Sequence, residues 1–172
     1  MKKIIFYVTS IVTGIILLST NSCKEKDNAT SDEITIRTMY KEFSEAVASK
    51  DINKIMSFYA PGDELVAFDA FLPRQYKGAT AYRKDYEGFF SSFPGPAKSV
   101  ITDLNIKVSG NLAYTNCIDK WTITGADSKP VDMVMRAIDV MEKRNDKWLI
   151  IHEHISFPVD PVSGKADYLS KP

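Results

Sequence analysis

The alternation of apolar and polar residues is most regular from Trp148 to Phe157, near the C-terminal end of the chain. Because alternate side chains of a β-strand point to opposite faces, this stretch divides into two sets. One face is predicted to carry Trp148, Ile150, His152, His154 and Ser156. The other is predicted to carry Leu149, Ile151, Glu153, Ile155 and Phe157. Both faces are largely apolar, which indicates a covered central strand, and the two histidines are interpreted as the polar floor of a cavity.

The N-terminal half of the chain has the spacing of amphipathic helices. Apolar residues at steps of three and four between residues 36 and 47 predict a first helix, which Thr30 is placed to cap. Asp51 is placed to cap a second helix, which Pro61-Gly62 ends. A third helix is expected after Gly78. Its aromatic stripe, which we interpret as core, comprises Tyr82, Tyr86, Phe89, Phe90 and Phe93.

The second half of the chain predicts β-structure. A short strand is expected at residues 65–71, where Asp69 interrupts an apolar run. Four longer strands are expected at residues 99–108, 112–124, 131–143 and 147–157, joined by turns. Since helices come first and a meander follows, the pattern predicts an α+β domain over residues 32–166, with helices on one face of a curved antiparallel sheet. Residues 167–172 are expected to form a tail.

The first 22 residues are typical of an export signal. Lys2 and Lys3 precede an apolar run at residues 4–18, which is shorter than the about 20 residues of a membrane span. The Ser22-Cys23 pair after this run resembles the lipobox of bacterial lipoproteins, which implies cleavage after residue 22 and lipid on Cys23. Residues 24–31 would then be a flexible tether, and the domain would sit on a membrane of the cell envelope, facing the periplasm or the cell surface.

Charge and cysteine content limit the partners, disulfides and metal sites that we expect. Lys and Arg number 22, Asp and Glu also 22, and the basic residues are scattered singly, so no nucleic-acid partner is expected. With Cys23 lipidated, Cys117 has no partner for a disulfide and is interpreted as a small core residue. His152 and His154 with Asp69 or Asp139 could ligate a metal, but no third ligand has diagnostic spacing. We therefore predict no metal and no cofactor.

Three motifs carry a resemblance to a known family. They are Asp51-Ile52 with Ile55 and Tyr59-Ala60; Tyr76-x-Gly78 with Ala81-Tyr82-Arg83; and Arg136 with Lys147-Trp148-Leu149 and the segment from His152 to Pro158. Over roughly residues 34–166 the chain resembles the nuclear transport factor 2-like superfamily, in its SnoaL-like and ketosteroid-isomerase-like branches. The resemblance implies a cone, in which a curved antiparallel sheet wraps around three helices with a pocket at the wide end. It also implies a homodimer packed through the outer face of the sheet.

The resemblance gives Asp69 a possible role. Ketosteroid isomerases carry a catalytic aspartate on the first strand after helix two, and Asp69 is similar in placement. A carboxylate in an apolar strand is expected to have a raised pKa, which suits a proton-abstracting base; a turn-capping or ion-paired aspartate is the alternative. The oxyanion tyrosine of that family falls on Phe43, which cannot donate a hydrogen bond, so steroid isomerisation by that route is not expected.

A second arrangement depends on strand register. If the last hairpin keeps Lys143 opposite Trp148, an aspartate falls opposite a histidine. These residues are Asp139 and His152, and the aspartate could orient the imidazole as a general base, although a shift of one residue would abolish the pair. The alternative is a buried, fully hydrogen-bonded network of the histidines and Arg136.

These observations predict a small-molecule pocket. Its aromatic lining is expected to be Tyr40, Tyr59, Tyr86 and Trp121, and its polar lining Asp69, Arg136, His152 and His154. We expect binding of a small anionic or aromatic ligand without turnover. The alternatives are a lyase or isomerase that uses Asp69 or His152 for proton transfer, and an oligomerisation module with a vestigial pocket. Phe43 and Ile138, where the resembling enzymes carry tyrosine and threonine, favour binding.

Overall fold

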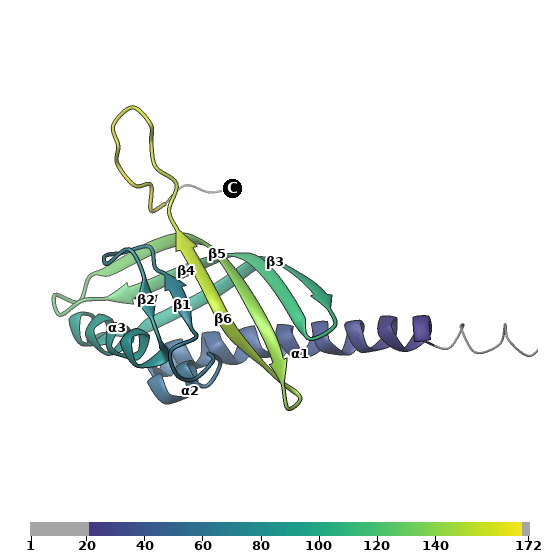
Figure 1. Cartoon of the computed structure of the whole chain (residues 1–172). Coiled ribbons are helices and arrows are strands. Elements are labelled where there is room, and N and C mark those ends of the chain that lie inside the picture. The colour runs from purple at the N-terminus through teal and green to yellow at the C-terminus, as the bar shows by residue number, and fades with distance from the viewer. Residues whose placement is uncertain (1–20, 170–172) are drawn as a thin grey trace, which may run out of the picture.

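Residues 21–169 are described by the computed structural model, which has three helices and a curved six-stranded sheet (Figure 1). The helices are α1 (Asn21–Ser49), α2 (Ile52–Met56) and α3 (Ala79–Ser92). The strands are β1 (Val66–Phe68), β2 (Tyr76–Lys77), β3 (Ala97–Ser109), β4 (Leu112–Thr124), β5 (Pro130–Arg144) and β6 (Lys147–Ser156). Residues 1–20, which hold nearly all of the predicted export signal, lie outside the described residues.

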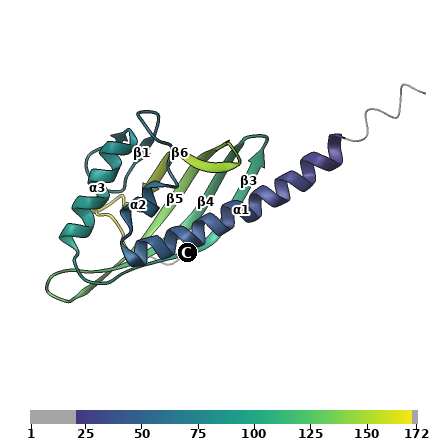
Figure 2. The same ribbon diagram turned by 90° about the horizontal axis from the view of Figure 1, so that it is seen from below.

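The sheet has the strand order β2-β1-β6-β5-β4-β3. The four long strands β3 to β6 pair antiparallel with their neighbours, as predicted, whereas the short β1 pairs parallel with β6. Figure 2 shows α1 running along the sheet, with α3 beside the end of the sheet where α1 ends. The predicted α+β cone is therefore confirmed, and β2 and the parallel β1–β6 pair are additions to it.

The helix boundaries differ from the prediction at the N-terminal side. α1 runs without a break through Thr30, which is therefore inside the helix and not its cap, and residues 24–31 are helical where we expected a tether. A helix that is packed beyond Ile36 can lengthen toward its N-terminus at little cost, because only nucleation is expensive. The cap of α2 is as predicted, since Asp51 accepts a hydrogen bond from the backbone N–H of Lys54 at 2.9 Å.

A β-bulge in the β5–β6 ladder decides which residues of β6 face the interior. Met141 pairs with Ile150 but Val140 pairs with His152, so Ile151 is an extra residue on β6. On the other edge of β6, the backbone of Ile150 exchanges two hydrogen bonds of 2.8 Å with the segment after α2. The bulge thus lies where β6 changes from that segment to β1 as its neighbour.

The bulge reverses the predicted faces of the second half of β6. Trp148 and Ile150 are buried as expected, but beyond the bulge Glu153 faces inward and His154 is exposed. Asp139 consequently lies opposite Glu153 and not opposite His152, so the predicted aspartate–histidine pair is wrong. One inserted residue shifts the two-residue period of a strand by one and so exchanges its faces.

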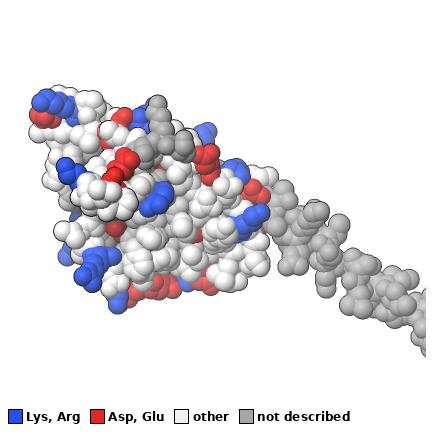
Figure 3. All heavy atoms as spheres, turned by 90° about the horizontal axis from the view of Figure 1, so that it is seen from above, with Lys and Arg blue, Asp and Glu red and all other residues white. Residues whose placement is uncertain are grey.

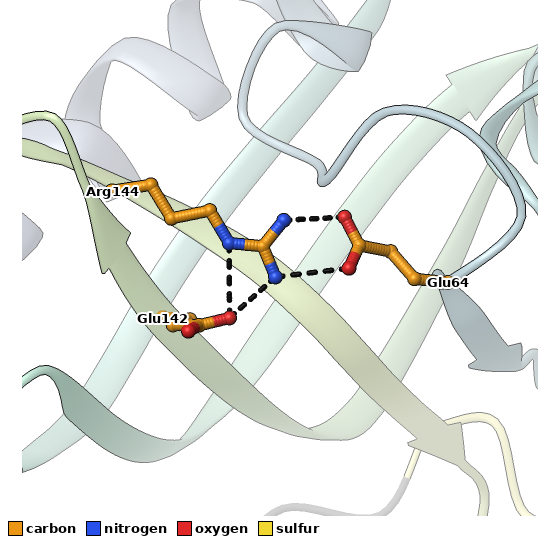
Figure 4. A network of polar contacts seen from close by, with 3 residues as sticks. All are labelled: Glu64, Glu142 and Arg144. Carbon is orange, nitrogen blue, oxygen red and sulfur yellow. Dashed lines mark hydrogen bonds and ion pairs between the residues drawn. The ribbon is translucent and has the colours of Figure 1, made fainter.

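An ion-pair network ties the segment before β1 to the last hairpin (Figure 4). Arg144, at the end of β5, donates to Glu64 Oε2 at 2.9 Å and to Glu142 Oε2 at 2.9 Å. Both ends of this network are partly open to solvent, which screens such pairs. Its role is to set the position of the chain that leads into β1, next to the bulged strand.

The C-terminal segment folds back on the sheet. Val134 donates its backbone N–H to the carbonyl oxygen of Tyr168 at 2.8 Å, and the rings of Tyr168 and Phe157 pack at 4.6 Å. Within residues 21–169, no helix combines the length and apolar character that crossing a bilayer requires.

Candidate functional site

Three carboxyl groups are buried on the concave face of the sheet, one on each of its central strands. Asp119 on β4, Asp139 on β5 and Glu153 on β6 are 8%, 3% and 5% exposed. The inward alternation of β4 and β5 places the aspartates there, and the bulge of β6 places the glutamate. Burying acidic groups beside one another is costly unless hydrogen bonds or protons compensate, and each of the three accepts at least one hydrogen bond.

Glu153 accepts hydrogen bonds from two tyrosines. The hydroxyl of Tyr59 donates to Oε1 at 2.8 Å, and the hydroxyl of Tyr82 donates to Oε2. Tyr86 joins this group, because its hydroxyl lies 3.1 Å from that of Tyr59. Burial, followed by the nearby Asp139, raises the pKa of Glu153 well above its usual range.

The two aspartates have separate partners. Asp119 accepts hydrogen bonds from Ser99 Oγ at 2.8 Å and from Trp121 Nε1 at 2.7 Å. Asp139 accepts one through Oδ2 from the hydroxyl of Tyr40, whereas its Oδ1 has no partner in the described part of the chain. Burial raises the pKa of Asp119 to about 6 and that of Asp139 to about 7. Near neutral pH the three carboxyl groups of this acidic floor (Asp119, Asp139 and Glu153) are therefore only partly ionised.

An outer chamber opens between α3 and the sheet, with a volume of about 240 Å³. It is lined by Asp69, Phe71, Tyr82, Lys84, Asp85, Tyr86, Gly88, Phe89, Ser92, Phe93, Trp121, Met133, Met135 and Ile155. The aromatic residues of α3 pack against Trp121, with ring centroids of Phe89 and Trp121 at 5.6 Å. The predominance of rings and methionines makes this chamber suited to a flat, apolar molecule.

An inner chamber of about 30 Å³ lies deeper, over the acidic floor. It is lined by Met39, Tyr40, Phe43, Tyr86, Ile101, Cys117, Asp119, Trp121, Ala137, Asp139, Ile150, Glu153 and Ile155. Tyr86, Trp121 and Ile155 line both chambers, so the two are neighbours. The inner chamber is large enough only for a group of about the size of one or two water molecules.

Asp69 follows β1 and lines the outer chamber. One carboxyl oxygen accepts the backbone N–H of Phe71 at 3.0 Å, which is the turn-capping alternative considered above. The other accepts the hydroxyl of Tyr82 at 3.4 Å. Burial raises the pKa of Asp69, as expected for a carboxylate in apolar surroundings.

A family model for the SnoaL-like domain matches residues 36–160. The chain belongs to the SnoaL-like family. A search of curated proteins gave no match.

Solved structures agree with this assignment. A nuclear transport factor 2-like protein of unknown function from Pseudomonas putida KT2440 is 31% identical with a TM-score of 0.75, over 84% of this chain and 99% of that one. A nuclear transport factor 2-like protein from Salmonella enterica is 18% identical with a TM-score of 0.70, over 81% and 100%. A candidate dehydratase of this family from Streptomyces avermitilis is 19% identical with a TM-score of 0.66, over 76% and 98%. The last two show the fold alone.

The aromatic residues predicted for the pocket of this SnoaL-like domain all face its interior. Tyr86 and Trp121 line both chambers, Tyr40 lines the inner one, and Tyr59 is buried beside Glu153. Tyr40 is notable because it lies one helical turn before Phe43, and its hydroxyl reaches the interior from α1.

Three predicted polar residues are not in the pocket of the SnoaL-like domain. His154 is exposed, and His152 contacts the neighbouring strand β1 through a 2.8 Å hydrogen bond between its Nδ1 and the carbonyl oxygen of Val66. Arg136 is exposed on the outer face and donates to the carbonyl oxygen of Phe157 at 3.1 Å. Their predicted pocket positions are wrong, for the histidines because of the bulge and for Arg136 because its side chain alternates outward on β5.

Sequence reasoning missed Glu153, Asp119 and Tyr82 as members of the site. Asp119 alternates with Cys117 and Trp121 in the sequence, and this pattern could have marked it as inward-facing. Glu153 depends on a bulge that nothing in the sequence indicates. In the described residues, no group of His, Cys, Asp and Glu is arranged to hold a metal ion.

Proposed function

We propose that this SnoaL-like domain binds a small, largely apolar molecule in the outer chamber. The size and lining of this chamber support the proposal. Its volume of about 240 Å³ suits a molecule with one or two rings, and aromatic and thioether side chains predominate in its walls. The anionic ligand considered from the sequence is no longer supported, because Arg136 lies on the outer face. Asp69 and the tyrosine hydroxyls remain as the polar groups that can orient a ligand.

Gly88 provides a direct test, because it lines the outer chamber and a Cβ at this position would contact nothing within 4 Å. Native mass spectrometry of the protein, purified gently from its own host, should detect a retained small molecule. Gly88→Leu places an isobutyl group in the chamber and should abolish retention. Gly88→Ala is the matched control, since it changes helix propensity equally while leaving the chamber open. Retention that survives Gly88→Leu would refute binding at this site.

A lyase or isomerase reaction with Asp69 as the proton-transferring group is the second candidate. The raised pKa of Asp69 and its contact with the Tyr82 hydroxyl favour it, because a base works best with a pKa close to the working pH. Similarity in fold to candidate dehydratases from Streptomyces avermitilis and Novosphingobium aromaticivorans is consistent with it. Turnover of a retained molecule, lost in Asp69→Asn and kept in His152→Ala, would support this candidate.

We also propose that the protein is an exported lipoprotein, held on a membrane of the cell envelope by lipid on Cys23. The sequence motif supports this. Metabolic labelling with a palmitate analogue should mark the wild-type protein and not Cys23→Ser. Labelling of both proteins, or of neither, would contradict the anchor.

A homodimer through the outer face of the sheet is proposed from the resemblance. On the face of the molecule seen in Figure 3, Lys, Arg, Asp and Glu are interspersed and uncharged side chains lie between them. Tyr114 and Ile138 are exposed apolar residues of the sheet, and Tyr114→Lys with Ile138→Lys should convert a dimer to a monomer in light scattering. A monomeric wild-type protein would rule this interface out.

A further inference from the structure

Asp139 lines the inner chamber, and its carboxyl oxygen Oδ1 has no hydrogen-bond partner in the described part of the chain. Asp139 is only 3% exposed, so water at the protein surface cannot donate a hydrogen bond to this oxygen. All carboxyl oxygens of Asp119 and Glu153 have donors from serine, tryptophan or tyrosine side chains. An unmade hydrogen bond at a buried polar group is expensive, and the chamber next to it therefore points to a missing donor.

The size and charge of the inner chamber restrict this donor. About 30 Å³ admits one small group and not a ring. Among the described residues that line it there are three acids and no lysine, arginine or histidine, so its potential becomes negative when these acids ionise. The indole ring of Trp121 and the phenol of Tyr86 also border it, and aromatic faces attract cations.

We propose that the two chambers together bind a primary amine, with its apolar body in the outer chamber and its ammonium group in the inner one, donating to Asp139 Oδ1. An ammonium group has about the size of a water molecule and carries three donors and a positive charge. This inference rests on the proposed function and specifies the class of its ligand. The side chains shared by both chambers, Tyr86, Trp121 and Ile155, would surround the carbon chain that joins body and ammonium.

Binding of an ammonium group is linked to the protons of the acidic floor. The titratable groups that face Asp139 are Tyr40 from α1, Tyr59 after α2, Tyr86 from α3, Cys117 and Asp119 from β4 and Glu153 from β6. Burial raises the pKa of each, so the tyrosines and the thiol stay neutral. The carboxyls must ionise to pair with the ammonium, and affinity should rise with pH across about 6 to 7.

Calorimetric titration of the full chain with 2-phenylethylamine and with 2-phenylethanol tests the inference. These probes share one body and differ in the head group. The amine should bind at least about tenfold more tightly than the alcohol at about pH 8, and the difference should shrink at about pH 5.5. Asp139→Asn should remove the preference for the amine and leave the affinity for the alcohol within about twofold.

Ala137→Val gives a second variant in case Asp139→Asn does not fold. It keeps every carboxyl group but fills the inner chamber, which Ala137 lines, and it should also remove the preference. Equal affinities for amine and alcohol in the wild type, with Gly88→Leu abolishing both, would overturn this inference and leave the outer-chamber function intact. Failure of both probes to bind would overturn it together with that function. An amine preference that survives both Asp139→Asn and Ala137→Val would also overturn it.

Discussion

Asp139 and Glu153 lie directly opposite each other on antiparallel β5 and β6, and both carboxyl groups are buried on the concave face of the sheet. Like charges in such a cross-strand pair repel, and burial adds a desolvation cost for each. Burial raises the pKa of both carboxyls, and a neighbouring acid raises each further: Asp119 for Asp139, and Asp139 for Glu153. Bound protons and tyrosine hydroxyls therefore offset the cost of burying these carboxyl groups, a role that a neighbouring cation could also fill.

Stability should decrease as the pH rises from about 5.5 to about 7. The pKa of Asp119 is about 6 and that of Asp139 about 7 in the native state, against 3.8 for an ordinary aspartate. The native state therefore binds more protons than the unfolded state between about pH 4 and 7, and the free energy of unfolding falls by up to roughly 1.4 kcal/mol per pH unit for each group. Urea denaturation at several pH values measures this slope.

Asp139→Asn is the control for the pH dependence, because the amide keeps the shape and cannot ionise. Its slope should be shallower than that of the wild type by the contribution of one group. Exposed carboxylates with lowered pKa, such as Asp132 and Asp160, lose stabilisation only at acidic pH and do not affect this range. A wild-type stability that is flat or rises from about pH 5.5 to about 7 would contradict the raised pKa values of the buried carboxyls.

Substitutions at two neighbouring residues of β6 should differ in how much they destabilise the protein. Glu153→Ala removes the acceptor of Tyr59 and Tyr82 and leaves two buried hydroxyls without it, so the free energy of unfolding should fall by roughly 2–4 kcal/mol. His152→Ala removes a hydrogen bond to Val66 and a ring contact with Phe68 and should cost about 1 kcal/mol. Denaturant titrations of both variants measure the difference. If His152→Ala cost more, the inward position of Glu153 would be wrong.

The faces of β6 mark the limit of what the sequence predicts. Its alternation correctly placed Trp148 and Ile150 inward, because that part of the ladder is regular. The bulge at Ile151 depends on the segment after α2, which bonds the backbone of Ile150 and is distant in sequence. Because these hydrogen bonds are made by backbone atoms, the spacing of apolar side chains in the sequence does not indicate them. Both histidines were therefore placed on the wrong face, and Glu153 was overlooked.

The sequence was a better guide where a single residue determines the local backbone conformation. The side chain of Asp51 caps α2 as its position predicts, and α3 begins after Gly78, which has φ of 83°. Asp69 was placed near the pocket from its position after helix two, and it lines the outer chamber. Its sequence surroundings also predicted the direction of its pKa shift, because an acid between apolar residues is desolvated wherever the chain folds over it.

Two glycine-to-alanine substitutions should have opposite effects. A Cβ at Gly95 would lie 2.9 Å from the carbonyl oxygen of Thr124, which belongs to a paired strand end and cannot move freely. Gly95→Ala should therefore lower the free energy of unfolding by about 1–3 kcal/mol. Gly88 lies within α3, and a Cβ there would meet no atom within 4 Å. Gly88→Ala should therefore raise the free energy of unfolding by up to about 1 kcal/mol. Thermal denaturation of both variants checks the pair, and a stabilising Gly95→Ala would contradict the close packing at Thr124.

Tyr82→Phe should raise the pKa of Glu153 further and lower stability. The hydroxyl of Tyr82 donates to Glu153 and more weakly to Asp69, and both bonds favour the ionised carboxylate. Without it, carbon-13 NMR titration of the glutamate carboxyls should show the Glu153 resonance titrating at a higher pH, and the free energy of unfolding should fall by about 1–2 kcal/mol.

Tyr76→Phe is the matched control, because its hydroxyl donates to Asp85 at 2.6 Å, away from the acidic floor. It should leave the Glu153 titration unchanged. A shift of the Glu153 titration to lower pH in Tyr82→Phe, or an equal shift in Tyr76→Phe, would show that the tyrosine hydroxyls do not control the protonation of this carboxyl.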